Sequence, residues 1–332
     1  MTIRRIFTWK SLVYGAMLPA LRPFPVFAER VLAACGRLCW ALPHRRRRLA
    51  RQLDAAAGAL NLPPLGPADR SNFAANTARF VARDYLLGRF DDQEPDRRFE
   101  ISGREHIINA LRDGRGVLLL GSHFGAHVAG IHWLNRQGWP LRMLIQRPKH
   151  VSKRLAGAFD RDAGDPFAQS AFFLRRHLPP IECARRVLRV HEAIRRGMVV
   201  YLSGDVPWES RNARPARLLG REQTFLSVWA DLAALTGAPV VPMFCGHRPG
   251  GGHRLTFDTP WHVRPGEEGE AVERYIRRLE RAIRDDPTDA VAHITWPCYS
   301  ARPDPPINAQ PVATGIAGTL SRRGTLPGRN WA

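Results

Sequence analysis

Short apolar runs alternate with amphipathic stretches along residues 104–283 of the chain. The apolar runs predict buried strands over residues 117–120, 141–146, 198–202 and 239–244. The stretches around them repeat apolar side chains at the helical period, and they predict a helix ending at Gly114 and helices over residues 125–137, 183–196 and 223–235. Uninterrupted apolar strands separated by such helices predict an α/β fold, with a mainly parallel central sheet covered by helices.

Three further segments extend this pattern. Phe73, Phe80 and Leu87 recur on one helical face and predict a helix over residues 67–87. A glycine-rich turn at residues 249–252 leads into residues 254–257, which we expect to pair with the preceding strand as a hairpin. A last helix is expected over residues 272–283, where the apolar residues share one face.

The N-terminal segment, residues 1–52, combines apolar, aromatic and basic residues. Prolines divide its apolar part into short amphipathic helices, and the consecutive arginines of residues 45–48 follow. Such a pattern is typical of a segment that docks on a membrane interface beside anionic headgroups. The alternative is a buried helical hairpin whose basic run is simply solvated.

No apolar stretch reaches the ~20 residues that cross a bilayer as a helix. We expect no signal-peptide cleavage, because no clear small-x-small site follows the apolar run of residues 11–21. Residues 53–300 are expected to form the α/β domain. Residues 301–332, rich in proline, glycine and arginine, are expected to form a disordered tail.

The charge of the chain narrows the class of partner. Fifty Lys and Arg against thirty Asp and Glu give a formal net charge of +20, which favours an anionic partner. The arginines form no recognisable nucleic-acid reader motif, and the basic run adjoins apolar sequence. We therefore expect anionic lipids or phosphorylated carriers, and no nucleic acid. The five cysteines include no C-x-x-C pair, which indicates a reducing compartment.

The candidate chemistry lies where the strand of residues 117–120 ends. Ligands of parallel sheets gather at the carboxyl ends of the strands, and His123 is expected there, at the start of the following helix. A helix N-terminus disfavours positive charge, so the imidazole is expected to stay neutral and accept a proton. Gly125 leaves room for a substrate, and free N–H groups nearby could stabilise an oxyanion. The alternative is a capping histidine without chemistry.

Other polar residues near this edge are candidates for binding. Arg147 follows a predicted strand, and together with Arg175 and Arg176 it is a candidate for binding phosphate. His123 and His127 have a spacing that metal ligands also use, but no H-E-x-x-H pattern or clear third ligand accompanies them. We therefore expect no metal, and we treat His127 as a substrate-binding candidate.

Four segments, in order, resemble motifs of one family. Residues 116–130 are similar to the first motif of the lipid A biosynthesis (lauroyl/myristoyl) acyltransferases, an apolar strand followed by His-x-x-x-x-Asp/Glu. Residues 143–149, 193–207 and 218–242 resemble that family's later blocks. The resemblance extends over residues 9–296, including the apolar lead-in.

The resemblance implies an O-acyltransferase in which His123 is the general base. It would deprotonate a hydroxyl of a lipid or glycolipid, which attacks the thioester of an acyl-carrier protein or of coenzyme A. No cofactor is implied. The resemblance also implies a peripheral enzyme of lipid biosynthesis at the cytoplasmic face of the bacterial inner membrane.

Two departures from the family pattern bear on these expectations. Val128 occupies the position of the acid that would orient His123. Asp205, ahead of Glu209, is the first candidate to replace it; His127 or a backbone carbonyl could orient the ring instead; or the protein is a catalytically inactive, membrane-associated lipid-binding homologue. Residues 292–296 lack the arginines of the family's Trp-x-His-Arg-Arg-like stretch, which leaves the acceptor open.

Overall fold

The computed structural model describes residues 25–86, 98–146, 171–174, 180–209, 213–249 and 251–300. Three helices come first: α3 (Pro25–Trp40), α4 (Pro43–Ala59) and α5 (Pro67–Leu86). The later helices are α6 (Arg104–Arg112), α7 (His127–Asn135), α10 (Pro180–Arg195), α11 (Val228–Thr236), α12 (Glu268–Asp285), the 3-10 turn η4 (Pro287–Asp289), α13 (Val291–Thr295) and α14 (Pro297–Ser300).

A seven-stranded sheet lies at the centre, in the order β1-β9-β8-β2-β5-β3-β4. Its strands are β1 (Phe99–Ser102), β2 (Val117–Gly121), β3 (Leu141–Gln146), β4 (Ala171–Leu174), β5 (Val199–Ser203), β8 (Val240–His247) and β9 (His253–Phe257). Strands β8, β2, β5, β3 and β4 run parallel, whereas β9 is antiparallel to β8. The α/β fold with a mainly parallel sheet is therefore confirmed, and so is the hairpin partner of β8.

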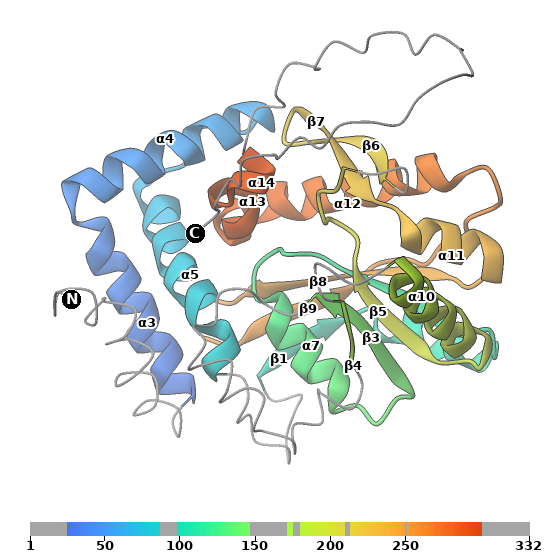
Figure 1. Cartoon of the computed structure of the whole chain (residues 1–332). Helices are drawn as coiled ribbons and strands as arrows, with labels where there is room; N and C mark the ends of the chain where they lie inside the picture. Colours follow the sequence, from blue (N-terminus) through green and yellow to red (C-terminus); the bar gives the residue numbers. More distant parts are fainter. Residues whose placement is uncertain are drawn as a thin grey trace, which may run out of the picture. The chain divides into compact units, whose positions relative to one another are not determined.

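Helices cover both faces of this sheet, with α7 on one face and α10, α11 and α12 on the other (Figure 1). The alternation of side chains along the strands explains this arrangement. Leu118 and Leu120 of β2 join the core cluster that contains α10, α11 and α12, whereas Leu119 joins the cluster beneath α6 and α7. A strand buried on both faces needs apolar residues at every position, as the sequence of β2 has.

The predicted helix over residues 223–235 is wrong in its first turn. Residues 223–226 belong to β7 (Arg221–Leu226), which pairs with β6 (Ala213–Leu218) in a separate antiparallel hairpin, and α11 begins at Val228. Burial alternates along β7, with Phe225 buried and Thr224 exposed, which is the period of a strand. The edge strands β1 and β4 were not predicted, since each is only four residues long.

The N-terminal helices pack onto the α/β core. α3 lies against α5, and Leu53 of α4 and Leu60, directly after α4, join the buried core. α4 runs without interruption through residue 52, where the sequence suggested a boundary. None of the helices in the described ranges combines the length and the hydropathy that a bilayer-spanning helix needs. Leu87, the residues before Pro25 and the predicted tail at 301–332 lie outside the described residues.

Candidate functional site

His123 lies in the connection between β2 and α7. β2 ends at Gly121 and α7 begins at His127, so His123 stands four residues before the helix rather than at its start. The field of a helix terminus fades within the first turn, so the expected effect of the helix on His123 is not supported. The charged group nearest to the ring is instead a carboxylate.

That carboxylate belongs to Asp205, which follows β5. β2 and β5 are neighbours, with Gly121 opposite Ser203, so the residues after both strands meet at the carboxyl edge of the sheet. Nδ1 of His123 lies 3.0 Å from Oδ1 of Asp205, and the main-chain N–H of His123 donates to Oδ2 at 2.7 Å. Asp205 is fully buried, whereas Glu209, the second candidate, is exposed. Val128 packs instead against the apolar cluster beneath α7.

Two residues near the C-terminal end of the domain complete the polar site. Nε2 of His293, from α13, lies 2.9 Å from Oδ2 of Asp205. The hydroxyl of Tyr299, from α14, donates to the main-chain oxygen of Asp205 at 2.9 Å, and its oxygen lies 3.1 Å from Nδ1 of His123. The Tyr299 hydroxyl donates its only proton to that carbonyl, so toward Nδ1 of His123 its oxygen can only accept. Oδ1 of Asp205 is also an acceptor, so Nδ1 of His123 must carry the proton. The arrangement therefore favours the tautomer in which Nε2 of His123 can accept a proton.

The electrostatics of the site favour an ionised Asp205 and a protonated Tyr299. Burial alone would raise the pKa of Asp205, but the charge that His123 carries when protonated and its hydrogen bond, together with those of His293, hold the pKa well below its ordinary value. Burial and the nearby Asp205 charge raise the pKa of Tyr299 well above its ordinary value. Asp205 therefore stays ionised, and its negative charge can stabilise a positive charge on the His123 ring.

The loop around His123 uses its backbone N–H groups internally, contrary to expectation. Those of His123, Phe124, Gly125 and Ala126 donate to the Asp205 carboxylate, the Ser122 hydroxyl, the Asp289 carbonyl and the Cys245 carbonyl, respectively. None of these four groups is left to stabilise an oxyanion. Any such stabilisation must come from other groups.

Gly125 has a different role from the expected one. Its φ is +53°, and a Cβ added there would lie 2.5 Å from the carbonyl oxygen of Cys245. The glycine is therefore required so that the loop can pack against the end of β8, not to leave space for a substrate.

Aromatic rings lie beside the His123 ring. The His123 ring lies 5.2 Å from that of His127 and 5.3 Å from that of Trp296, measured between centroids. Phe80 of α5 contacts both His127 and Trp296. The His123 side chain is still 23% exposed, so the imidazole is accessible within a largely apolar surround. His127 is buried and forms part of this wall.

The remaining candidates concern phosphate and metal binding. Arg147, Arg175 and Arg176 lie outside the described residues, although they follow β3 and β4 in the chain. Across the described ranges, no group of three or more His, Cys, Asp or Glu side chains could hold a metal ion. Burial, with a smaller contribution from the Arg136 charge, lowers the pKa of His132 to about 3.

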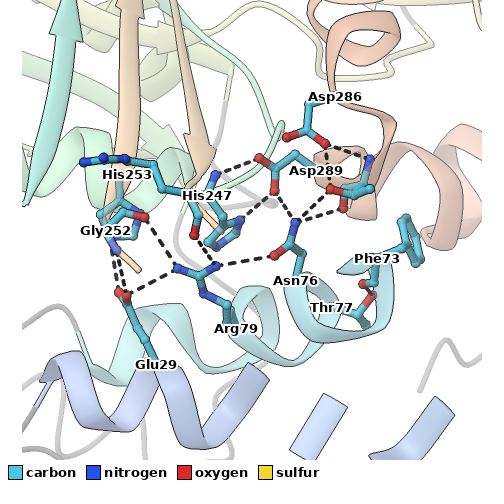
Figure 2. Close-up of polar contacts among 12 residues, drawn as sticks. Glu29, Phe73, Asn76, Thr77, Arg79, His247, Gly252, His253, Asp286 and Asp289 are labelled. Atoms are coloured by element: carbon cyan, nitrogen blue, oxygen red, sulfur yellow. Dashed lines mark hydrogen bonds and ion pairs between the residues drawn. The ribbon is translucent and has the colours of Figure 1, made fainter. Parts of the chain in front are cut away.

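A second buried polar cluster, which the sequence did not reveal, joins Asn76, His247 and Asp289 (Figure 2). Oδ1 of Asp289 lies 2.7 Å from Nδ1 of His247 and accepts a hydrogen bond from Asn76 at 2.9 Å. The main-chain N–H of His247 donates to Oδ2 of Asp289 at 2.7 Å. Because the carbonyl of Asp289 also holds Gly125, this cluster supports the loop that carries His123.

The same cluster anchors α3 through Glu29. Arg79 of α5 lies 3.3 Å from the Glu29 carboxylate and Arg98 lies 3.0 Å from it. Burial alone would raise the pKa of Glu29, but its hydrogen bond with His253 and the charges of His253, Arg98 and Arg79 hold it well below its ordinary value. A charged Glu29 therefore ties α3 to α5 and to the turn before β9.

The contributions of His293, Tyr299 and Glu29 could not be found from the sequence pattern. His293 and Tyr299 lie 88 and 94 positions after Asp205. Both come from short helices with no periodicity to predict them, α13 of five residues and α14 of four. In residues 292–296, the departure from the family pattern is the sequence signal that points to this part of the chain.

Comparison with known proteins adds one finding to this geometry. The family model described as "Bacterial lipid A biosynthesis acyltransferase" matches residues 3–155 and 177–291. No curated protein matches the chain. The matched ranges contain His123 and Asp205 and end before His293 and Tyr299.

Proposed function

Since the chain belongs to the bacterial lipid A biosynthesis acyltransferase family, we propose that it transfers a fatty acyl group from a thioester to a hydroxyl of a lipid or glycolipid. One observation supports this proposal most: His123 presents an accessible imidazole whose Nδ1 is held by the buried carboxylate of Asp205. A general base needs this arrangement, because the nitrogen that takes the proton must be unprotonated and must point toward the acceptor hydroxyl.

In the proposed reaction, Nε2 of His123 takes the proton of the acceptor hydroxyl. The oxygen forms a bond to the thioester carbonyl carbon, and the carbon–sulfur bond then breaks. The departing thiolate receives the proton back from the imidazolium, so the products are an ester and a free thiol. Asp205 stabilises the imidazolium while it exists. General base assistance is worth roughly 10²–10⁴-fold in rate.

The donor and the acceptor belong to the same proposal. We propose that the thioester is that of an acyl-carrier protein or of coenzyme A, and that no cofactor takes part. Arg147, Arg175 and Arg176 follow the carboxyl ends of β3 and β4 in the chain and are proposed to bind the donor phosphate. Residues 292–296 contribute His293 to the site but lack the arginines of the family's stretch, so the acceptor need not be a lipid A precursor.

We further propose that the protein acts while docked on anionic lipid, as a peripheral protein at the cytoplasmic face of the inner membrane. Support comes from the corner between α3 and α4, where Leu38 is 71% exposed and Leu42 is 44% exposed. Arg46, Arg47 and Arg48 are exposed beside them. Exposed apolar side chains next to clustered arginines suit an interface with acidic headgroups.

Purified protein assayed with an acyl thioester and mixed lipid acceptors tests the proposed reaction. We expect ester formation and thiol release by the wild-type protein, and loss of both in His123→Ala. The lipid profile of cells without the gene should lose one acyl-chain mass from one lipid class. Lipid binding without transfer in either protein would instead support the inactive lipid-binding homologue.

A further inference from the structure

The Asp205 carboxylate is shared by two histidines, of which only His123 has an exposed side chain. We propose that His293 is a positioning residue for acyl transfer, holding one oxygen of Asp205 so that the other is aimed at His123. This inference rests on the proposed function, because it concerns the rate of that reaction.

The distribution of donors over the two carboxylate oxygens supports this role. Oδ2 receives the main-chain N–H of His123 at 2.7 Å and Nε2 of His293 at 2.9 Å. Oδ1 faces Nδ1 of His123 at 3.0 Å. A carboxylate held at one oxygen by two donors cannot rotate without breaking one of them, so its other oxygen stays directed at the catalytic ring.

The burial of His293 fixes how it can act. Its side chain is fully buried, so it touches no substrate. Its Nδ1 is buried and has no hydrogen-bond partner in the part of the chain that the structure describes. The tautomer with the proton on Nε2 therefore satisfies Asp205 without burying a second, unpaired N–H group. The ring of Tyr299, 4.7 Å away, packs against that of His293.

The molecule provides a matched control for this histidine. His247 and Asp289 form another buried histidine–carboxylate contact, with 2.7 Å between Nδ1 and Oδ1 (Figure 2). Both histidines are buried and each donates to a fully buried aspartate. Removing His247 should therefore cost stability as removing His293 does, and it should also loosen the loop that the Asp289 carbonyl holds at Gly125. It leaves the donor to Asp205 in place, so the two variants are distinguished by the pH profile and not by kcat alone.

The test compares His293→Leu, His293→Gln and His247→Leu in the full chain. The probe is lauroyl-coenzyme A, with vesicles of a Gram-negative bacterial lipid extract as the acceptor. We expect kcat of His293→Leu to fall by roughly 10–100-fold, the range for losing a hydrogen bond to a charged group, with KM unchanged. Gln can present an N–H near the position of Nε2, so His293→Gln should recover most of kcat.

The pH profile separates positioning from a general loss of structure. Without the donor from His293, the carboxylate interacts more strongly with a protonated His123, so the acid limb of kcat/KM should move to higher pH. His247→Leu should lose thermal stability to a similar degree, but the acid limb of its kcat/KM profile should stay at the wild-type pH. The inference is overturned if His293→Leu retains kcat and its profile, or if all three variants lose kcat equally with no movement of the limb.

NMR spectroscopy shows whether His293 donates to Asp205 even if a His293 variant does not fold, or if the wild-type protein shows no acyl transfer. Long-range 15N–1H spectra of the wild-type protein should show His293 as the Nε2–H tautomer, and Asp205→Asn should shift that resonance. An Nδ1–H tautomer, or a resonance indifferent to Asp205→Asn, contradicts the inference. A wild-type protein without transfer would overturn the proposed function, while this spectrum still decides whether His293 holds Asp205.

Discussion

At the scale of single residues, the site depends on how its loop is fixed between β2 and α7. His123 is accessible, whereas the loop after it is tied to β8 and η4 through its backbone. The sequence predicted His123 and placed Asp205 first among its partners, because both follow apolar strands of a parallel sheet. The sequence could not predict that the main-chain N–H groups of residues 123–126 already donate hydrogen bonds within the protein. Acceptors such as Cys245 and Asp289 are distant in the chain.

Gly125→Ala tests how tightly that loop is held. The new Cβ would need φ near +53° and would approach the Cys245 carbonyl, so we expect roughly 1–3 kcal/mol less unfolding free energy and a lower transfer rate. Gly114→Ala is the matched control, because φ is +69° there but a Cβ would meet nothing within 4 Å. Urea unfolding curves give both values. Equal losses with unchanged transfer rates would show that the loop is not constrained as described.

At the scale of elements, the accuracy of the prediction followed the length and periodicity of each segment. The central strands were predicted because both of their faces are buried, which gives continuous apolar runs. β7 was taken for the start of a helix because its polar residues continue into the apolar α11 without a proline or glycine between them. Pairing with β6 decides its conformation, and that contact cannot be found in a local pattern.

The α3–α4 corner carries a prediction of its own. Each arginine near an anionic surface is worth about 1 kcal/mol, so Arg46, Arg47 and Arg48 replaced together by Gln should weaken binding to phosphatidylglycerol vesicles roughly 10²-fold. Arg264, Arg277 and Arg284, which are also exposed, provide a control with the same loss of charge elsewhere. Vesicle sedimentation measures both. If the two triple variants bind alike, docking does not depend on the corner.

At the scale of the whole molecule, two buried polar clusters join the N-terminal helices, the sheet edge and the C-terminal helices. One is centred on Asp205 and the other links Glu29 to Asp289 (Figure 2). Each contains a buried carboxylate, Asp205 or Glu29, whose pKa lies well below its ordinary value in the folded chain. The stability of the fold should therefore depend on pH.

We expect the unfolding free energy to fall as the pH drops below about 6.5, because His132 is protonated in the unfolded chain but stays neutral in the folded one. It should fall further below about 4, near the pKa of Asp and Glu in an unfolded chain. The pKa values of Glu29 and Asp205 are held well below that range in the folded protein. Below pH about 4 the unfolded chain binds protons that the folded chain refuses, and the stabilisation is lost. Urea unfolding at pH 7, 5 and 3.5 measures this effect.

Glu29→Gln is the corresponding variant. It leaves Arg79 and Arg98 without their carboxylate, so at pH 7 it should cost roughly 3 kcal/mol and flatten the acid slope. Glu192→Gln breaks an exposed ion pair with Arg196 and should change the free energy by less than about 1 kcal/mol. An unchanged acid slope in Glu29→Gln would show that the Glu29 cluster does not set the pH dependence.

The pairing of Asp205 with His123 is the central claim, and the kinetics of Asp205→Asn test it most directly. Asn keeps the size of the side chain but removes the charge that stabilises the imidazolium, so we expect kcat for acyl transfer to fall roughly 10²–10⁴-fold with KM nearly unchanged. Glu209→Gln, which alters an exposed carboxylate four residues away, should keep the wild-type kcat. A folded Asp205→Asn protein with the wild-type kcat would contradict the account.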